Sequence, residues 1–166
     1  ANAAPPGNTA PAFKEVNTSG KEISLADFKG KTVVIEWTNN GCPFVQKHYN
    51  SKNMQATQAV ATKDGVVWLS VISSKPGSQG HVLPEQADKL TADRGAKPTH
   101  VLLDPDGSMG RAYGAKTTPH MFIVTPDGKI AYNDDNQIVV IEPDGSGRVQ
   151  LTSGRYNNYP AWSPDG

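Results

Sequence analysis

Short apolar runs alternate with polar, helix-forming segments along this chain. The runs at 31–37 (KTVVIEW) and 66–72 (VVWLSVI) are almost continuously apolar and rich in β-branched residues. This pattern is typical of strands that are buried on both faces of a sheet. Shorter runs at 99–103, 120–124 and 129–132 predict three further strands. The runs together predict a central sheet of about five strands.

The segments between these runs predict helices. Residues 42–63 begin with Cys42-Pro43, contain mostly helix-forming residues and stop at Asp64-Gly65, which predicts one helix. Residues 84–94 and 108–114 predict two more helices. The order β-α-β-α-β-α-β-β then predicts an α/β fold, with a mostly parallel sheet, helices on both of its faces and a hairpin at one edge.

The overall charge argues against two classes of partner. Sixteen basic residues balance sixteen acidic ones, so the chain has no electrostatic reason to bind nucleic acid or an anionic membrane. No apolar run approaches the roughly 18 residues of a membrane-spanning helix.

Residues 1–11 are small and Pro-rich, and we expect them to form a flexible lead-in. The same composition is also typical of the mature end that signal-peptide cleavage leaves.

Cys42 is the one cysteine of the chain, which excludes a disulfide framework and a multi-cysteine zinc site. It lies between a predicted strand and the first turn of a predicted helix, where backbone N–H groups and the helix dipole favour the nucleophilic thiolate. Glu36, six residues earlier, is a candidate proton carrier beside the thiol, because burial favours the protonated form of a carboxyl group. The alternatives are an inert thiol and a hydrogen-bonded structural carboxyl group.

Three separated motifs resemble the redoxin branch of the thioredoxin-fold proteins, the alkyl hydroperoxide reductase and thiol-specific antioxidant group. Residues 24–37 (SLADFKGKTVVIEW) resemble the opening of this family, and residues 36–49 (EWTNNGCPFVQKHY) are similar to exported bacterial redoxin-like proteins. Residues 117–119 (TTP) resemble the cis-proline loop of the family. The resemblance covers about residues 11–132. It implies a thioredoxin-like fold and a periplasmic or secreted location.

The resemblance also implies roles for single residues. Cys42 matches the nucleophilic cysteine, Pro119 matches the cis-proline that lies against it, and Glu36 matches the buried acid of thioredoxins. The sequence departs from the family at Val45, where a thioredoxin has its resolving cysteine, so dithiol exchange within one chain is excluded. It also departs from the peroxiredoxin pattern P-x-x-x-T-x-x-C, because Asn39 stands at the threonine position.

Three hypotheses of function remain open. The first is a thiol redox protein that uses no cofactor and in which external thiols or protein disulfides react with Cys42. The second is a redox-silent chimera of two folds. The third is a copper- or zinc-binding protein with Cys42, His48 and His120 as ligands. Six residues along a helix place His48 on a different side from Cys42, which disfavours this metal site.

The C-terminal part of the chain has a different pattern. It contains two predicted strands, at 137–142 and 148–152, and no predicted helix after about residue 114. Residues 126–166, which end in PAWSPDG, resemble one repeat of a TolB-like β-propeller. One blade cannot close a propeller. The overlap of the two resemblances over 126–132 predicts a recombined or engineered chain.

This chimera hypothesis has structural consequences. The predicted parts are a lead-in over 1–11, a thioredoxin-like domain over 12–132 and a propeller-blade fragment over 133–166 that packs on the same sheet. We expect the C-terminal helix of the thioredoxin-like fold to be replaced by a β-meander, which pairs with strand 129–132 and extends the sheet to about seven strands. Tyr156, Tyr159 and Trp162 would then fold back onto the sheet. The chain is expected to be a monomer or, failing that packing, a strand-swapped dimer.

Overall fold

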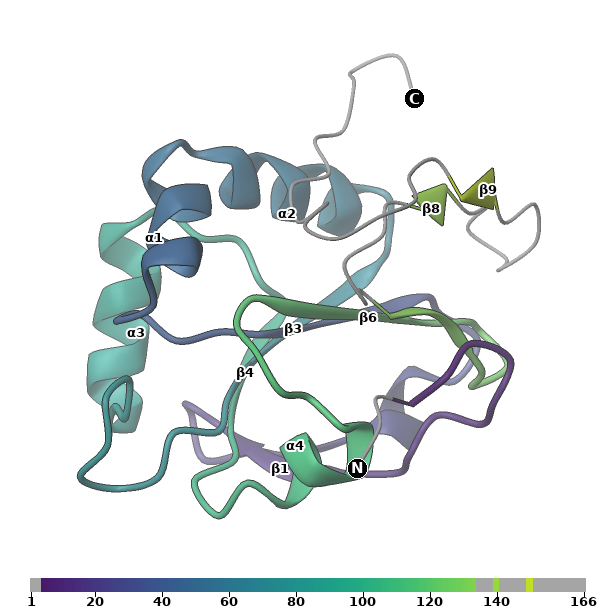
Figure 1. Ribbon diagram of the computed structural model, residues 1–166, viewed down its shortest axis with the longest axis horizontal. Coiled ribbons are helices and arrows are strands. Elements are labelled where there is room, and N and C mark those ends of the chain that lie inside the picture. Colours follow the sequence, from purple (N-terminus) through teal and green to yellow (C-terminus); the bar gives the residue numbers. More distant parts are fainter. Residues whose placement is uncertain (1–3, 134–138, 141–148, 151–166) are drawn as a thin grey trace.

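The computed structural model describes residues 4–133, 139–140 and 149–150, and Figure 1 shows a central sheet with helices on both faces. The strands are β1 (Lys14–Asn17), β2 (Glu22–Ser24), β3 (Val33–Trp37), β4 (Val67–Ile72), β5 (His100–Leu103), β6 (His120–Val124), β7 (Ile130–Asn133), β8 (Val139–Val140) and β9 (Val149–Gln150). The helices are α1 (Pro43–Asn50), α2 (Asn53–Lys63), α3 (Pro84–Asp93) and α4 (Ser108–Tyr113), with a 3₁₀ turn η1 at Leu25–Phe28. The predicted α/β class is therefore confirmed.

The main sheet has seven strands in the order β2-β1-β5-β4-β3-β6-β7. Its centre follows the prediction, because β3 pairs in parallel with β4, and β4 pairs in parallel with β5. The prediction of a mostly parallel sheet is wrong, since the other pairings are antiparallel. The reason is that a hairpin flanks the parallel centre on each side. The sequence predicts the β6–β7 hairpin but not the β1–β2 hairpin, whose strands are short and mostly polar.

The single helix predicted over 42–63 is wrong in one respect, because this segment forms two helices. At the end of α1 the backbone N–H of Ser51 donates to the carbonyl oxygen of Lys47, and the Ser51 hydroxyl donates to that of His48. The next residue, Lys52, has a left-handed backbone with a φ of 65°. This conformation interrupts a right-handed helix. The interruption lets α2 run in a new direction over the sheet (Figure 1).

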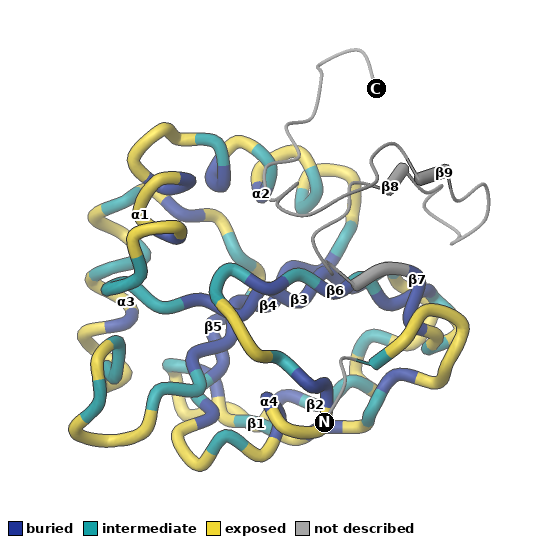
Figure 2. The backbone as a smooth tube through the Cα atoms, viewed as in Figure 1, coloured by how far each residue is buried: buried dark blue, intermediate teal, exposed yellow. Residues whose placement is uncertain are grey.

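Side chains that alternate along β3 separate two layers of the core. Trp37 packs against Tyr113 of α4 and Phe122 of β6, with ring centroids 5.3 and 5.4 Å away. Val34 lies on the opposite face, in a cluster with residues of α1 and α2. All residues of β3 are buried, as Figure 2 shows in dark blue, so the prediction of a strand buried on both faces is confirmed. Helices α1, α2 and α3 cover one face and α4 covers the other (Figure 1).

The outer edge of β7 is covered by the N-terminal segment. The backbone N–H of Ile130 donates to the carbonyl oxygen of Asn8 at 2.8 Å, and the N–H of Gly7 donates to the carbonyl oxygen of Ile130 at 2.7 Å. Ala10 is 5 % exposed and belongs to the core. The prediction of a flexible lead-in over 1–11 is therefore wrong for this part of the segment, because its backbone pairs with a strand edge.

The predicted β-meander does not extend the main sheet. Strands β8 and β9 pair with each other in a separate two-stranded sheet. The prediction that they pair with β7 is wrong. The physical reason is that the N-terminal segment already occupies the beginning of the outer edge of β7. The main sheet reaches seven strands through the β1–β2 hairpin instead. The predicted packing of the rest of 133–166, including Tyr156, Tyr159 and Trp162, lies outside the described residues.

Candidate active site

Cys42 lies in the loop that joins β3 to α1. It directly precedes Pro43, the first residue of the helix, as the sequence predicts. Hydrogen bonds hold this loop closely: the backbone N–H of Cys42 donates to the carbonyl oxygen of Asn39 at 3.0 Å, and the N–H of Gln46 donates to that of Cys42 at 2.9 Å. The side chain of Gln46 also donates to the carbonyl oxygen of Asn40 at 2.9 Å. The residue itself is half-buried, so its thiol lies at the boundary between core and solvent.

The loop before β6 approaches the thiol from a distant part of the chain. The peptide bond between Thr118 and Pro119 is cis, as predicted. The Cys42 thiol donates a hydrogen bond to the carbonyl oxygen of Thr118 at 3.3 Å. The structure therefore brings together two of the three residues that the sequence predicts for the site, Cys42 and the proline loop.

The surroundings of Cys42 favour its thiolate. Burial raises the pKa of the thiol, but hydrogen bonding by the Thr118 side chain and by the backbone N–H groups of Val45 and Phe44 outweighs burial, so the pKa lies below its ordinary value. The uncharged thiol makes no hydrogen bond to the helix end, so these N–H groups act on the anion. They belong to the first turn of α1, where N–H groups lack partners within the helix. The site therefore has the electrostatic character of a reactive cysteine.

Val45 occupies the position at which a thioredoxin has its second cysteine. Its side chain is 1 % exposed and packs in the cluster that also contains Val34 and Tyr49. The chain has one cysteine in total. A mixed disulfide at Cys42 therefore cannot be resolved within one molecule.

Glu36 is buried on the same side of the sheet as α1, but its hydrogen bonds occupy it elsewhere. The side chain has no exposed surface. It accepts hydrogen bonds from the hydroxyl of Tyr49 (2.8 and 3.0 Å), the indole of Trp68 (3.0 Å), the hydroxyl of Ser70 (2.9 Å) and the amide of Gln58 (3.3 Å). This arrangement matches the alternative of a hydrogen-bonded structural carboxyl group. Burial and the negative charge of Glu36 raise the pKa of Tyr49, so its hydroxyl stays a donor.

The two histidines of the metal hypothesis are engaged with other groups. His48 is buried, with Nδ1 3.2 Å from the side-chain nitrogen of Asn53. The ring of His120 stacks on Phe122 with centroids 4.6 Å apart. Among the described residues, no three or more His, Cys, Asp or Glu side chains gather in a way that could hold a metal ion. In the part of the chain that the structure describes, these two histidines therefore do not form a ligand set with Cys42.

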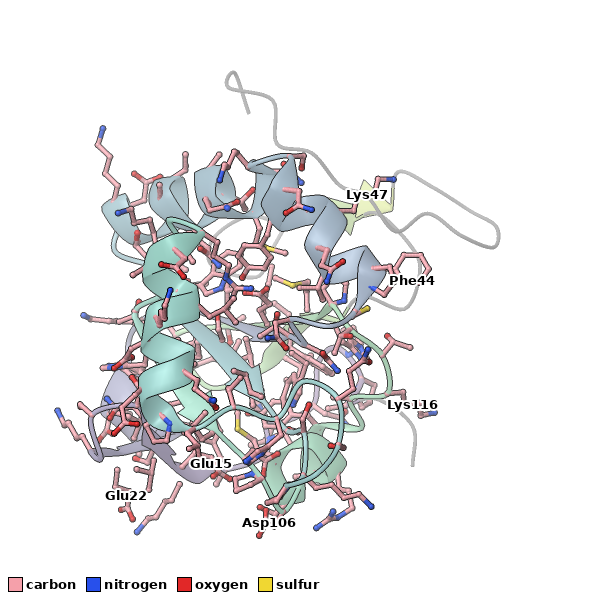
Figure 3. All side chains as sticks on the ribbon, turned by 90° about the vertical axis from the view of Figure 1, so that its left-hand side faces the viewer. Glu15, Glu22, Phe44, Lys47, Asp106 and Lys116 are labelled. Atoms are coloured by element: carbon pink, nitrogen blue, oxygen red, sulfur yellow. The ribbon has the colours of Figure 1, made fainter. Side chains whose placement is uncertain are left out.

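Two features beside the thiol are not among the residues that the sequence predicts for the site. Phe44 is 56 % exposed and projects outward from the first turn of α1 (Figure 3). The loop between β4 and α3 reaches the cysteine loop, because Gln79 donates to the carbonyl oxygen of Gly41 and accepts from the side chain of Asn39, both at 3.3 Å. The stretch 73–80 is mostly polar and contains Gly77 and Gly80, so it has no hydrophobic periodicity that would show what it contacts.

Comparisons of sequence agree with this geometry. The family model described as Redoxin matches residues 5–141. The thiol-disulfide oxidoreductase ResA of Bacillus subtilis is 28 % identical over 131 residues, which is 75 % of this chain. The chain spans 64 % of the length of that relative. The redoxin match extends beyond the predicted range of 11–132 in both directions.

Solved structures resemble the whole fold. An uncharacterized conserved protein from Geobacillus kaustophilus has a TM-score of 0.72 and 26 % identity, covering 99 % of this chain and 78 % of that protein. The thioredoxin domain of the thiol-disulfide oxidoreductase BVU-2223 from Bacteroides vulgatus has a TM-score of 0.63 and 24 % identity, covering 80 % of this chain and 89 % of that domain. The second likeness shows the fold alone. It confirms the predicted thioredoxin-like fold.

Within the described part of the chain, no helix combines the length and the apolar composition that a membrane crossing requires.

Proposed function

Because the chain belongs to the redoxin family, we propose that it is a thiol-disulfide oxidoreductase whose one reactive group is the thiol of Cys42. The observation that carries this proposal is the position of the sulfur. It lies at the first turn of α1, half-exposed, and 3.3 Å from the carbonyl oxygen of Thr118, the residue before the cis-proline Pro119. The lowered pKa of Cys42 supports the same role.

The proposed reaction is thiol-disulfide exchange that needs an external thiol. The Cys42 thiolate attacks one sulfur of an external disulfide, forms a mixed disulfide and expels the other sulfur as a thiolate. Because Val45 stands where a resolving cysteine would be, a second, external thiolate then attacks the mixed disulfide. That step releases the bound half as a new disulfide and restores the Cys42 thiolate. Across the two steps, one sulfur of the external disulfide leaves as a thiolate, the attacking external thiolate is incorporated into the new disulfide, and the protein returns to its starting state.

The other predicted site residues take supporting roles in this proposal. The Pro119 loop shapes the surface on which an external disulfide meets the sulfur, because the neighbouring Thr118 already contacts Cys42. The role of Glu36 as a proton carrier stays a prediction. Its four hydrogen-bond donors favour a role in holding β3, β4, α1 and α2 together.

The pH dependence of Cys42 alkylation tests the proposal. We expect the rate of reaction with iodoacetamide to reach half its maximum at a pH below the ordinary thiol value of roughly 8.5. We also expect glutathione disulfide to form one mixed disulfide per chain, detected by mass, which added glutathione reverses. The Cys42→Ser variant is the control and should show neither reaction. An alkylation midpoint at or above that of free cysteine would overturn the proposal.

The partners and the location belong to the same proposal. We propose that small thiols or protein disulfides are the partners, and that the protein acts in the periplasm or outside the cell, as its resemblance to exported redoxin-like proteins implies. Whether the chain is a monomer or a strand-swapped dimer stays a prediction that light scattering can check.

The two alternative functions receive less support. A copper or zinc site would have to recruit His48 and His120 away from Asn53 and Phe122. The hypothesis of a redox-silent chimera concerns residues 126–166, of which most lie outside the described part. The redoxin match reaches residue 141 and so does not favour a separate origin for the beginning of that stretch.

A further inference from the structure

The loop between β4 and α3 forms a clasp with the loop that carries the thiol. The side-chain amide of Gln79 donates to the carbonyl oxygen of Gly41, the residue directly before Cys42, at 3.3 Å. In return, the side-chain amide of Asn39 donates to the carbonyl oxygen of Gln79 at 3.3 Å. We use the name Gln79 clasp for these two hydrogen bonds. They join segments about forty residues apart in the sequence.

Two glycines allow the loops to approach this closely. A Cβ atom on Gly80 would lie 2.3 Å from Oδ1 of Asn39, and a Cβ atom on Gly41 would lie 2.7 Å from Cγ of Gln79. Real Cβ atoms essentially never make such contacts. Gly80 also has a positive φ of 86°, whereas Gly41 does not have a positive φ. A side chain at position 41 would therefore be opposed by the Gln79 side chain, whereas the backbone conformation of Gly41 does not itself require glycine.

The clasp acts on the groups that orient Cys42. Asn39 accepts a hydrogen bond from the N–H of Gly41 through Oδ1 (2.8 Å) and from the N–H of Cys42 through its carbonyl oxygen (3.0 Å). Gln79 thus fixes Asn39 on one side and Gly41 on the other. These contacts lie directly before the point where Cys42 enters α1.

We propose that Gln79 is a positioning residue for the Cys42 nucleophile, and that it acts by holding the cysteine loop against the first turn of α1. This inference rests on the proposed function, because it concerns the reactivity of the same thiol. It adds a residue that lies in a different loop and outside every sequence motif of the family resemblance, although it contacts the motif that carries Cys42. Substrate does not need to touch Gln79 for this effect.

The Gln79→Met variant tests the clasp, because methionine keeps much of the volume and length of glutamine but cannot donate to Gly41. We expect the alkylation rate of Cys42 at neutral pH to fall about threefold or more, and the midpoint of its pH profile to move upward, since the thiolate loses part of its N–H stabilisation. The matched control is Ser78→Ala. It removes a hydrogen bond from Ser78 to Lys75 within the same loop and leaves the clasp intact. Its pH profile should match that of the unmodified protein.

A double-variant cycle separates the clasp from general damage to the loop. Gly41→Ala in the natural background should collide with Gln79 and lower the reactivity of Cys42. The same change in a Gln79→Ala background should have a much smaller effect, because the colliding atoms are gone. Equal effects of Gly41→Ala in both backgrounds would overturn the inference, and so would an unchanged pH profile in Gln79→Met. If the unmodified protein itself shows an ordinary, unreactive thiol, the proposed function fails instead, which distinguishes the two outcomes.

Discussion

Glu36 and Cys42 are six residues apart, and their side chains have opposite environments. Glu36 is fully buried and is surrounded by four hydrogen-bonding residues of β4, α1 and α2. Cys42 is half-exposed and its thiol donates one hydrogen bond, to Thr118. A polar group whose partners are all protein groups fixes the fold, whereas a polar group with few partners stays available to other molecules.

The comparison also separates the stability of the fold from the reactivity of the thiol. The buried carboxyl group organises donors that would otherwise be unsatisfied, so its loss should lower the free energy of unfolding and leave thiol chemistry nearly unchanged. The thiol contributes little to packing, so its loss should remove the chemistry and leave stability nearly unchanged. The changes below test this division, in order of their expected effect on the free energy of unfolding.

The largest effect is expected for Glu36→Ala. Removing the carboxyl group leaves the hydroxyls of Tyr49 and Ser70 and the N–H of Trp68 buried without an acceptor. We expect a loss of about 3 kcal/mol or more in the free energy of unfolding, measured by urea denaturation. The alkylation rate of Cys42 in the folded protein should change less than about twofold. A large loss of reactivity in a stably folded Glu36→Gln variant would show instead that Glu36 serves the thiol.

A smaller effect is expected for Tyr49→Phe. This change removes one donor to Glu36 but keeps the ring, which lies 3.6 Å below the guanidinium group of Arg94. We expect a loss of about 1–2 kcal/mol in the free energy of unfolding. Arg94→Lys, which keeps the charge, is the matched test of the ring contact. A Tyr49→Phe variant as unstable as Glu36→Ala would mean that Tyr49 alone accounts for the carboxyl group's contribution.

The third effect depends on pH and lies far from the thiol. Burial and the negative charges of Asp104 and Asp106 raise the pKa of Glu15 to about 7. Figure 3 shows Glu15 and Asp106 at the opposite end of the molecule from Phe44. Because the folded state binds this proton more tightly than the unfolded state, the contribution of Glu15 to stability is fully present below the ordinary Glu pKa and is lost as the pH rises through about 7.

Glu15→Gln tests this pH dependence. The variant should flatten the decline in stability between mildly acidic and mildly alkaline pH, with a gain of about 1 kcal/mol on the alkaline side after allowance for solvent screening. Glu22→Gln on the exposed part of the neighbouring strand is the control, and it should leave the decline in place. An unchanged decline in Glu15→Gln would assign the titration to another group.

The smallest effect on stability is expected for Cys42→Ala. The side chain is half-exposed and only partly packed in the cluster near Val45, so the free energy of unfolding should change by less than about 0.5 kcal/mol. The same variant should lose all alkylation and all mixed-disulfide formation. A stability loss comparable to that of Glu36→Ala would contradict the division between the two residues.

The sequence predicts Cys42 and the Pro119 loop because each is marked by a short motif of neighbouring residues. Cys42-Pro43 after an apolar strand predicts a cysteine at a helix start, and the motif of Pro119 predicts the cis-proline loop. The partners of Glu36 are different, because Tyr49, Gln58 and Trp68 come from three elements and no local pattern brings them together. The break at Lys52 escaped prediction for a related reason: helix-forming residues lie on both sides of one left-handed position.

Errors about the sheet have a similar cause. The apolar runs predict the buried strands β3 and β4, but pairing at the edges depends on backbone groups that composition does not report. The sequence therefore does not show that Gly7 and Asn8 would take the edge of β7, or that the polar β1–β2 hairpin would extend the sheet at its other side.

The pairing of the N-terminal segment with β7 also decides where the protein can be shortened for expression. A version that begins at residue 12 would retain Cys42, Pro119 and Gln79, yet it would leave the backbone groups of Ile130 without their bonds to Gly7 and Asn8. Exposed strand edges of this kind attract other chains, so solubility would suffer before chemistry did. The backbone N–H of Ala4 also donates a hydrogen bond to the carbonyl oxygen of Tyr113. A shortened version of the protein, or one released from an affinity tag, should therefore retain every residue from Ala4 onward.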